Sequence, residues 1–148
     1  MISIKKADVS DSDQVAKLFD AYRVFYHKNS DIDAARNFIL ERIRNNESEI
    51  YVAELAEKQL VGFVQLYPLF SSTRMKRLWL LNDLFVDVAH RGKNISIQLI
   101  DRAKQLAIET NACGLLLETA KTNEVGNKLY PRTGFNIDQD HNYYSWNV

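Results

Sequence analysis

The sequence predicts a mixed α/β fold in a single domain spanning residues 1–148. Apolar residues recur at helical spacing in some segments and form alternating or continuous runs in others, and the two kinds of segment are interleaved. No linker rich in proline or glycine divides the chain, which has only five glycines and two prolines. With 46% hydrophobic and 26% charged residues, the chain has the composition of an ordinary globular protein that buries a core.

The first third of the sequence is expected to form one strand and two helices. Residues 2–5 alternate between apolar and polar, which is typical of a short strand. Residues 11–13 offer an N-cap for a helix whose apolar residues recur at helical spacing over 15–26. A second stripe of this kind occupies residues 34–43, and its helix is expected to end near Asn45.

The middle of the chain changes to strands. Residues 50–53 and 60–67 are predicted to form two strands joined by a polar turn, and Pro68 is expected to end the second. Residues 78–88 form a long, nearly continuous apolar run, which is typical of a strand covered on both faces.

The last third is expected to alternate helices and strands. A helix with its apolar face over residues 99–107 precedes a buried strand at 114–119. Asn123 is predicted to cap a short helix that ends at Tyr130–Pro131, because the residue before a proline disfavours helical geometry. Further strands are expected at 134–135 and 142–146, which gives the order β-α-α-β-β-β-α-β-α-β-β.

Composition excludes several classes of function. The 19 basic and 19 acidic residues cancel, so the chain lacks the broad positive field that nucleic-acid binding requires. A single cysteine, Cys113, and three scattered histidines provide no metal site. No apolar run approaches about 18 residues, so no membrane association is expected and a cytoplasmic protein is predicted. The aromatic segment 143–146 is expected either to close the sheet or to contact a second copy in a homodimer.

The most informative segment is the junction between a strand and a helix at residues 84–97. The strand runs into the turn Arg91–Gly92–Lys93–Asn94, which opens directly into the amphipathic helix. The first N–H groups of a helix lack internal partners, and the helix dipole makes that end positive, so this junction is typical of a phosphate site. The spacing fits neither a P-loop nor the dinucleotide fingerprint.

The junction resembles the acetyl-CoA motif of the GCN5-related N-acetyltransferase (GNAT) family, Arg/Gln-x-x-Gly-x-Gly/Ala after an apolar strand. Residues 81–86 and 115–119 resemble that family's fourth and fifth strands, and residues 123–135 resemble its final motif, Asn-x-x-Ala-x-x-Leu-Tyr-x-x-x-Gly-Phe. The resemblance implies a mixed, mostly antiparallel sheet of six to seven strands flanked by about four helices. Asn94 and Ser96 replace motif glycines and Gly126 replaces the alanine; Asn94 is expected to keep the left-handed turn.

The resemblance also implies a cofactor site and a catalytic acid. Acetyl-CoA is the expected acetyl donor, and a strand bulge in the family turns a backbone N–H near Phe85 or Val86 toward the thioester. Tyr130 is the expected general acid for the leaving thiolate. The residues expected to contact acetyl-CoA are Phe85, Val86, Asp87, Val88, Arg91, Gly92, Lys93, Asn94, Ile95, Ser96, Ile97, Asn123, Asn127 and Tyr130.

The general base is left open among three candidates. Family members that resemble polyamine acetyltransferases carry a carboxylate where this chain has Asn82, which cannot accept a proton at neutral pH. The role would pass to Asp83, to Glu118 or to a water chain. Neighbouring strand residues point to opposite faces, so Asp83 reaches the required side only if the bulge shifts the alternation.

The acceptor implied by the resemblance is a primary amine. A small molecule resembling a polyamine, an amino sugar or an amino acid is the first hypothesis, with Tyr22, Tyr26, Asn82 and Asp83 as substrate contacts. A peptide N-terminus or a protein lysine is the second. A non-catalytic sensor that binds acyl-CoA without turnover is the third.

Overall fold

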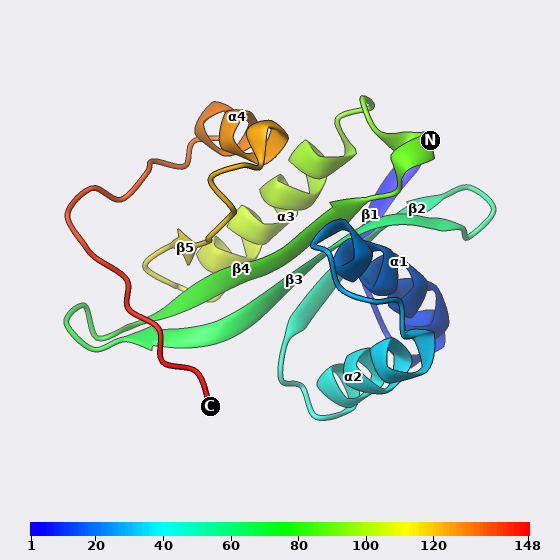
Figure 1. Ribbon diagram of the computed structural model, residues 1–148, viewed down its shortest axis with the longest axis horizontal. Helices are drawn as coiled ribbons and strands as arrows, with labels where there is room; N and C mark the ends of the chain where they lie inside the picture. Colours follow the sequence, from blue (N-terminus) through cyan, green and yellow to red (C-terminus); the bar gives the residue numbers. More distant parts are fainter. The chain divides into compact units, whose positions relative to one another are not determined.

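The computed structural model describes residues 1–148 and divides them into two compact units, Met1–Leu117 and Glu118–Val148, which are described separately (Figure 1). The first unit holds a sheet and three α-helices, and the second holds the last α-helix. The expectation of one domain over the whole chain stays a prediction. No helix is long and apolar enough to cross a membrane.

The first unit is built on a five-stranded mixed sheet with the strand order β1-β2-β3-β4-β5. Its four longer strands form antiparallel pairs, whereas the short β5 lies parallel to β4. The mixed, mostly antiparallel character expected of the fold is therefore confirmed. The strands are β1 (Ile2–Lys6), β2 (Glu49–Leu55), β3 (Leu60–Ser71), β4 (Lys76–Val86) and β5 (Leu115–Leu116).

Helices cover both faces of this sheet (Figure 1). The helices α1 (Ser12–Phe25) and α2 (Ile32–Arg44) cover one face, where Val15, Ile39 and Phe63 are completely buried in a common core. The helix α3 (Ile95–Glu109) covers the other face, with Leu99 and Ile100 fully buried. One layer of helices thus lies on each side of the strands.

The expected count of six to seven strands is wrong, because the structure has five. The strand predicted at 114–119 is reduced to Leu115–Leu116, and residues 134–135 and 142–146 form no strand. In the second unit, the Asp138 carboxylate accepts hydrogen bonds from the backbone N–H groups of Asp140 and His141. This local turn lies between the two predicted strands. The N–H groups of Gly134 and Phe135 donate to Pro131 and Tyr130 at the end of α4, so they are not available to a neighbouring strand.

Pro68 does not end β3, which continues to Ser71. Pro68 lies opposite Trp79, whose own N–H donates to Gly114 on the β5 side rather than toward β3. Backbone N–H groups alternate in direction along a strand, so an N–H at position 68 would point toward β2. The pairing of β2 with β3 ends at Glu49 and Leu66, before this position. Proline therefore removes no ladder hydrogen bond at this position.

Candidate active site

A β-bulge in β4 determines which way its side chains point. Gln65 pairs with Asp83 and the next residue, Leu66, pairs with Leu81, so Asn82 is an extra residue in β4. The bulge reverses the alternation of faces. Before it, Trp79 donates through Nε1 to Thr110 beyond the end of α3. After it, Asp83 is directed to the opposite face, where Gln65 bonds it.

Asp83 was expected to reach the required side of the sheet only if a bulge shifted the alternation of side chains. The bulge at Asn82 shifts it, and Asp83 lies on the face covered by α1. The Phe85 side chain, two residues further along, belongs to the core under α1 and α2. Trp79 and Asp83 would share a face in a regular strand, since they are four residues apart. The bulge instead assigns them to different helix layers.

The edge of β4 beyond the bulge is open. The strand β5 pairs only with Trp79 and Leu80. Asp87 donates its N–H to Val61 in β3 at 2.9 Å, and backbone groups alternate along an antiparallel strand. Phe85 therefore bonds toward β3, whereas the backbone N–H groups of Leu84 and Val86 point to the open edge. Of the two residues expected to supply a donor, Val86 has the accessible one.

The open edge leads into the N-terminus of α3, as the sequence predicted. Gly92 has φ of +76° and Asn94 has φ of +60°, so the expectation that Asn94 keeps the left-handed turn is confirmed. No side chain caps the helix, and its first internal hydrogen bond runs from Gln98 N–H to Asn94 O. The N–H groups of residues 95–97 therefore lack helical partners, which is the arrangement of an anion site.

Arg91 places a positive charge at the end of β4. Its Nε donates to the Val86 carbonyl at 3.0 Å, and its guanidinium carbon lies 5.4 Å from the centre of the Phe85 ring and 5.7 Å from that of Phe25. The next two residues, Gly92 and Lys93, are exposed and form the outer part of the turn. Arg91 thus connects the open edge with the end of α1.

The short 3-10 helix Val88–His90 precedes this turn. His90 Nδ1 lies 2.8 Å from the Asp87 carboxylate, which holds the segment in place. Of the remaining cofactor candidates here, Val88 is largely exposed and Ser96 is half-buried.

A buried hydrogen-bond network surrounds Asp83, which is 3% exposed. Gln65 Nε2 donates to Oδ2 at 2.6 Å and Asn82 Nδ2 donates to Oδ1 at 3.1 Å. Tyr22 is a third hydrogen-bond partner of the carboxyl group. Ser48 Oγ in turn donates to Gln65 Oε1 at 2.8 Å. These side chains converge from α1, β3, β4 and the residue before β2.

Burial sets the ionisation of this network. Desolvation raises the pKa of the Asp83 carboxyl, and the three donors oppose this shift without cancelling it. Burial, with the negative charge of Asp83 as a smaller cause, raises the pKa of Tyr67 to about 12. No lysine, arginine or histidine forms an ion pair with Asp83. A buried carboxylate without a cation is costly, which makes this point of the fold suited to a cationic ligand.

The aromatic end of α1 lies beside this network. The Tyr22 hydroxyl donates to the backbone carbonyl of Asn82 at 3.2 Å. The Tyr26 ring packs edge-on against Tyr22 at 4.9 Å between centroids and stays partly exposed. The structure therefore brings together Tyr22, Asn82 and Asp83, with Tyr26 next to them.

The second unit positions the other predicted residues on α4 (Glu124–Arg132). Asn123 Oδ1 accepts from Gly126 N–H at 3.1 Å, so the predicted cap is confirmed. A Cβ at residue 126 would lie 2.6 Å from Asn123 Nδ2 and 3.3 Å from the Tyr130 ring, which accounts for glycine in place of the family's alanine. Asn127 Nδ2 donates to Asn123 O at 2.8 Å.

Tyr130 lies in the last turn of α4, and its ring packs edge-on against Phe135. The helix continues past Pro131 to Arg132, contrary to expectation, because Thr133 N–H donates to Leu129 O and closes the turn after the proline. Glu118 is exposed at the start of this unit. The catalytic roles of Tyr130 and Glu118 stay predictions.

Sequence reasoning missed Gln65 and Ser48. Gln65 is fully buried, and it is the one polar side chain in the otherwise apolar run from residue 60 to residue 66. A single buried amide in such a run needs partners, which was a usable signal. Ser48 gives no comparable signal, because it lies among polar residues after α2.

Comparison with known proteins identifies the family. The model of the acetyltransferase (GNAT) family matches residues 14–135. The chain belongs to the GNAT family. It is 40% identical over 147 residues to an uncharacterized N-acetyltransferase of Bacillus subtilis, YhfO, covering 99% of this chain and 98% of that one. A probable acetyltransferase of Haemophilus influenzae is 31% identical over 132 residues, with coverage of 86% and 90%.

A solved structure supports the same assignment. The crystal structure of a probable acetyltransferase superimposes with a TM-score of 0.94 at 39% identity, covering 99% of this GNAT chain and 97% of that chain. The chain is therefore an acyltransferase of the acetyltransferase type.

Proposed function

We propose that this GNAT protein transfers the acetyl group of acetyl-CoA directly to a primary amine of a small molecule. The observation that carries the proposal is the bulge at Asn82. Beyond the bulge, the backbone N–H groups of Leu84 and Val86 point to the open edge of β4. The buried Asp83 carboxylate lies on the face of the same strand that α1 covers.

The donor side follows from the open edge and the N-terminus of α3. Residues 92–97 would hold the pyrophosphate, and the amide groups of acetyl-CoA would pair along Val86–Val88 as an added strand. The Val86 N–H would donate to the thioester oxygen as negative charge develops there. Arg91 would supply a compensating charge for the phosphates.

The acceptor side follows from Asp83. An ammonium ion near Tyr22 would supply the cation that the buried carboxylate lacks. Because Asp83 is 3% exposed, the proton would reach it through the Tyr22 hydroxyl rather than by direct contact. The amine nitrogen then bonds to the acetyl carbon as the carbon–sulfur bond breaks, and Tyr130 would donate its phenolic proton to the leaving thiolate. The second proton that the nitrogen loses as it becomes an amide would restore the Tyr130 hydroxyl through solvent.

The fold alone does not decide between small amines and peptides. Solved structures of the same fold include a ribosomal-protein-alanine N-acetyltransferase at 24% identity and an aminoglycoside acetyltransferase at 23% identity. The proposal of a small amine rests on the buried carboxylate, which favours a compact cation able to approach the end of α1.

The test measures CoA release with acetyl-CoA and a panel of polyamines, amino sugars, amino-acid amides and short peptides. Turnover with small amines alone supports the proposal, and turnover restricted to peptides refutes it. Binding of acetyl-CoA without turnover of any amine would make the protein a sensor.

Matched variants test the assigned roles. Tyr130→Phe is expected to lower kcat about 10²-fold or more while acetyl-CoA binding is retained. Tyr144→Phe serves as its control, since Tyr144 is 91% exposed. Tyr22→Phe is expected to lower kcat and to remove the acid limb of the pH profile. An unchanged kcat in either Tyr130→Phe or Tyr22→Phe would contradict the corresponding role.

A further inference from the structure

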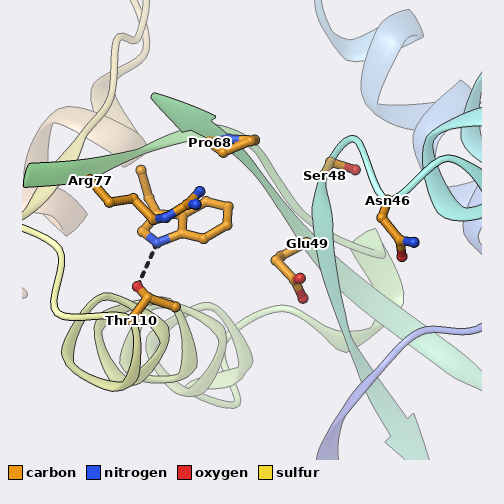
Figure 2. A pocket seen from close by; sticks show the side chains of 7 residues that line it. Asn46, Ser48, Glu49, Pro68, Arg77 and Thr110 are labelled. Carbon is orange, nitrogen blue, oxygen red and sulfur yellow. Dashed lines mark hydrogen bonds between the residues drawn. The ribbon is translucent and has the colours of Figure 1, made fainter. Parts of the chain in front are cut away.

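A pocket of about 290 Å³ lies on the α3 face of the sheet, and of the network around Asp83 only Ser48 lines it (Figure 2). It forms because α3 ends at Glu109 while the strands beneath it extend further. Its walls come from three neighbouring strands, the segment before β2 and the residue after α3. The lining residues are Asn46, Ser48, Glu49, Pro68, Arg77, Trp79 and Thr110.

The pocket is remote from the cofactor site along the axis of α3. Residues 92–97, the proposed site of the pyrophosphate, lie at the N-terminus of this 15-residue helix, and the pocket lies at its C-terminus. A helix of that length spans about 22 Å. A ligand of the pocket would therefore be separate from acetyl-CoA, and the inference does not depend on the proposed acetylation.

One wall of the pocket carries a cation without a carboxylate partner. The Arg77 guanidinium forms no ion pair and no hydrogen bond, and it lies over the rings of Phe70 at 4.9 Å and Trp79 at 5.3 Å. Stacking on two rings orients the guanidinium plane and leaves its N–H groups available. This wall is suited to a carboxylate, which binds a guanidinium through two parallel hydrogen bonds.

The facing wall carries the carboxylate of Glu49, and only one of its two oxygens is in an ion pair. Glu49 Oε2 is paired with Lys6 Nζ at 2.7 Å, and Oε1 has no partner. The side-chain amide of Asn46 lies on the same side of the space and has no hydrogen bond (Figure 2). Glu49 and Arg77 face one another without forming an ion pair, so a ligand with both charges would satisfy both walls.

The surface between the two walls is apolar and rigid. Pro68 and Trp79 are cross-strand neighbours. The Trp79 indole is fixed by its hydrogen bond to Thr110 Oγ1 at 2.9 Å. An apolar side chain would pack there at little entropic cost, since the indole is already ordered.

We propose that this pocket binds a free α-amino acid with an apolar side chain. Its carboxylate would pair with Arg77, its ammonium group with Glu49 Oε1, and its side chain would lie against Trp79 and Pro68. The volume of about 290 Å³ lies just below the range of about 300–1,000 Å³ typical of drug-sized ligands, which suits a ligand as small as an amino acid.

The test measures binding by calorimetry to the full chain without acetyl-CoA. L-Phenylalanine is compared with 3-phenylpropionate, which lacks the amine, and with 2-phenylethylamine, which lacks the carboxylate. The amino acid is expected to bind at least about tenfold more tightly than either analogue, since each analogue leaves one wall unpaired. No binding of phenylalanine, or equal binding of an analogue, overturns the proposal.

Variants locate the binding site. Arg77→Gln is expected to weaken phenylalanine binding at least about tenfold, and Glu49→Gln, a second and independent variant, is expected to do the same. Arg74→Gln is the control, because Arg74 is an exposed arginine of the same hairpin outside the pocket. Acetyl-CoA affinity should be unchanged in all three. Binding that survives both pocket substitutions but is lost in Asp83→Asn would place the amino acid in the acceptor site and refute the inference.

Discussion

The substitution Gln65→Met tests the network around Asp83. Methionine has a similar length and removes both polar groups of Gln65, which donates to Asp83 at 2.6 Å and accepts from Ser48 at 2.8 Å. A hydrogen bond to a charged group contributes about 1.5–3 kcal/mol and a neutral one about 0.5–1.5 kcal/mol. The free energy of unfolding is therefore expected to fall by about 2–4 kcal/mol when Asp83 is ionised.

The loss should depend on pH. Burial raises the pKa of Asp83 in the folded chain, so the contribution of this group to the free energy of unfolding is fully present below its unfolded pKa and is lost as pH rises through its folded pKa. Gln65 favours the ionised form, and its removal raises this pKa further. Over a pH range from acid to alkaline, the deficit of the variant relative to the wild type should therefore grow as pH rises through the raised pKa of Asp83.

Urea unfolding followed by tryptophan fluorescence measures both effects. Ser48→Ala is the matched control: it removes only the neutral hydrogen bond, and it should cost about 1 kcal/mol at every pH. The reasoning is refuted if Gln65→Met is no more destabilising than Ser48→Ala, or if its deficit is the same at both ends of the pH range.

Three further substitutions test the backbone around the site and the cap of α4. Gly62→Ala should destabilise by about 1–3 kcal/mol and weaken acetyl-CoA binding, because its Cβ would lie 3.0 Å from the Phe85 carbonyl oxygen; an unchanged urea midpoint and affinity would contradict this. Gly92→Ala has open space but a φ of +76°, so it should cost about 1 kcal/mol in backbone strain, with reduced cofactor affinity measured by calorimetry. Asn123→Ala should destabilise α4 by about 1 kcal/mol and speed proteolysis of the second unit, whereas an unchanged cleavage rate would argue against the cap.

Local patterns predicted the parts of the fold that depend on neighbours in sequence. The helices of the first unit follow from their apolar stripes, and the turn at Asn94 follows from the tolerance of asparagine for left-handed geometry. The strand expected at 134–135 is absent because Gly134 and Phe135 donate their N–H groups to Pro131 and Tyr130 at the end of α4. Pro68 was misjudged for a related reason: whether a proline breaks a strand depends on where the neighbouring strand begins.

The candidate site was predictable where chemistry lies within one segment. The proposed anion site at residues 92–97 is a single continuous stretch, and its sequence, a glycine-containing turn that opens into a helix, is typical of anion binding. The surroundings of Asp83 come from four separate elements, so no local pattern connects Gln65 or Ser48 with it. The pocket beside Trp79 was unforeseen because it depends on where α3 ends relative to three strands.

The extra residue in β4 makes the length of this strand a constraint in itself. Before the bulge Trp79 lies on the α3 side, whereas after it Asp83 and Phe85 lie on the side of α1 and α2. Exchanging one residue of β4 disturbs only the helix layer that its own side chain faces. Deleting one residue would turn every later side chain of the strand to the wrong layer, placing Asp83 against α3. Divergence or redesign of this enzyme can therefore alter the identity of residues in β4 but not their number.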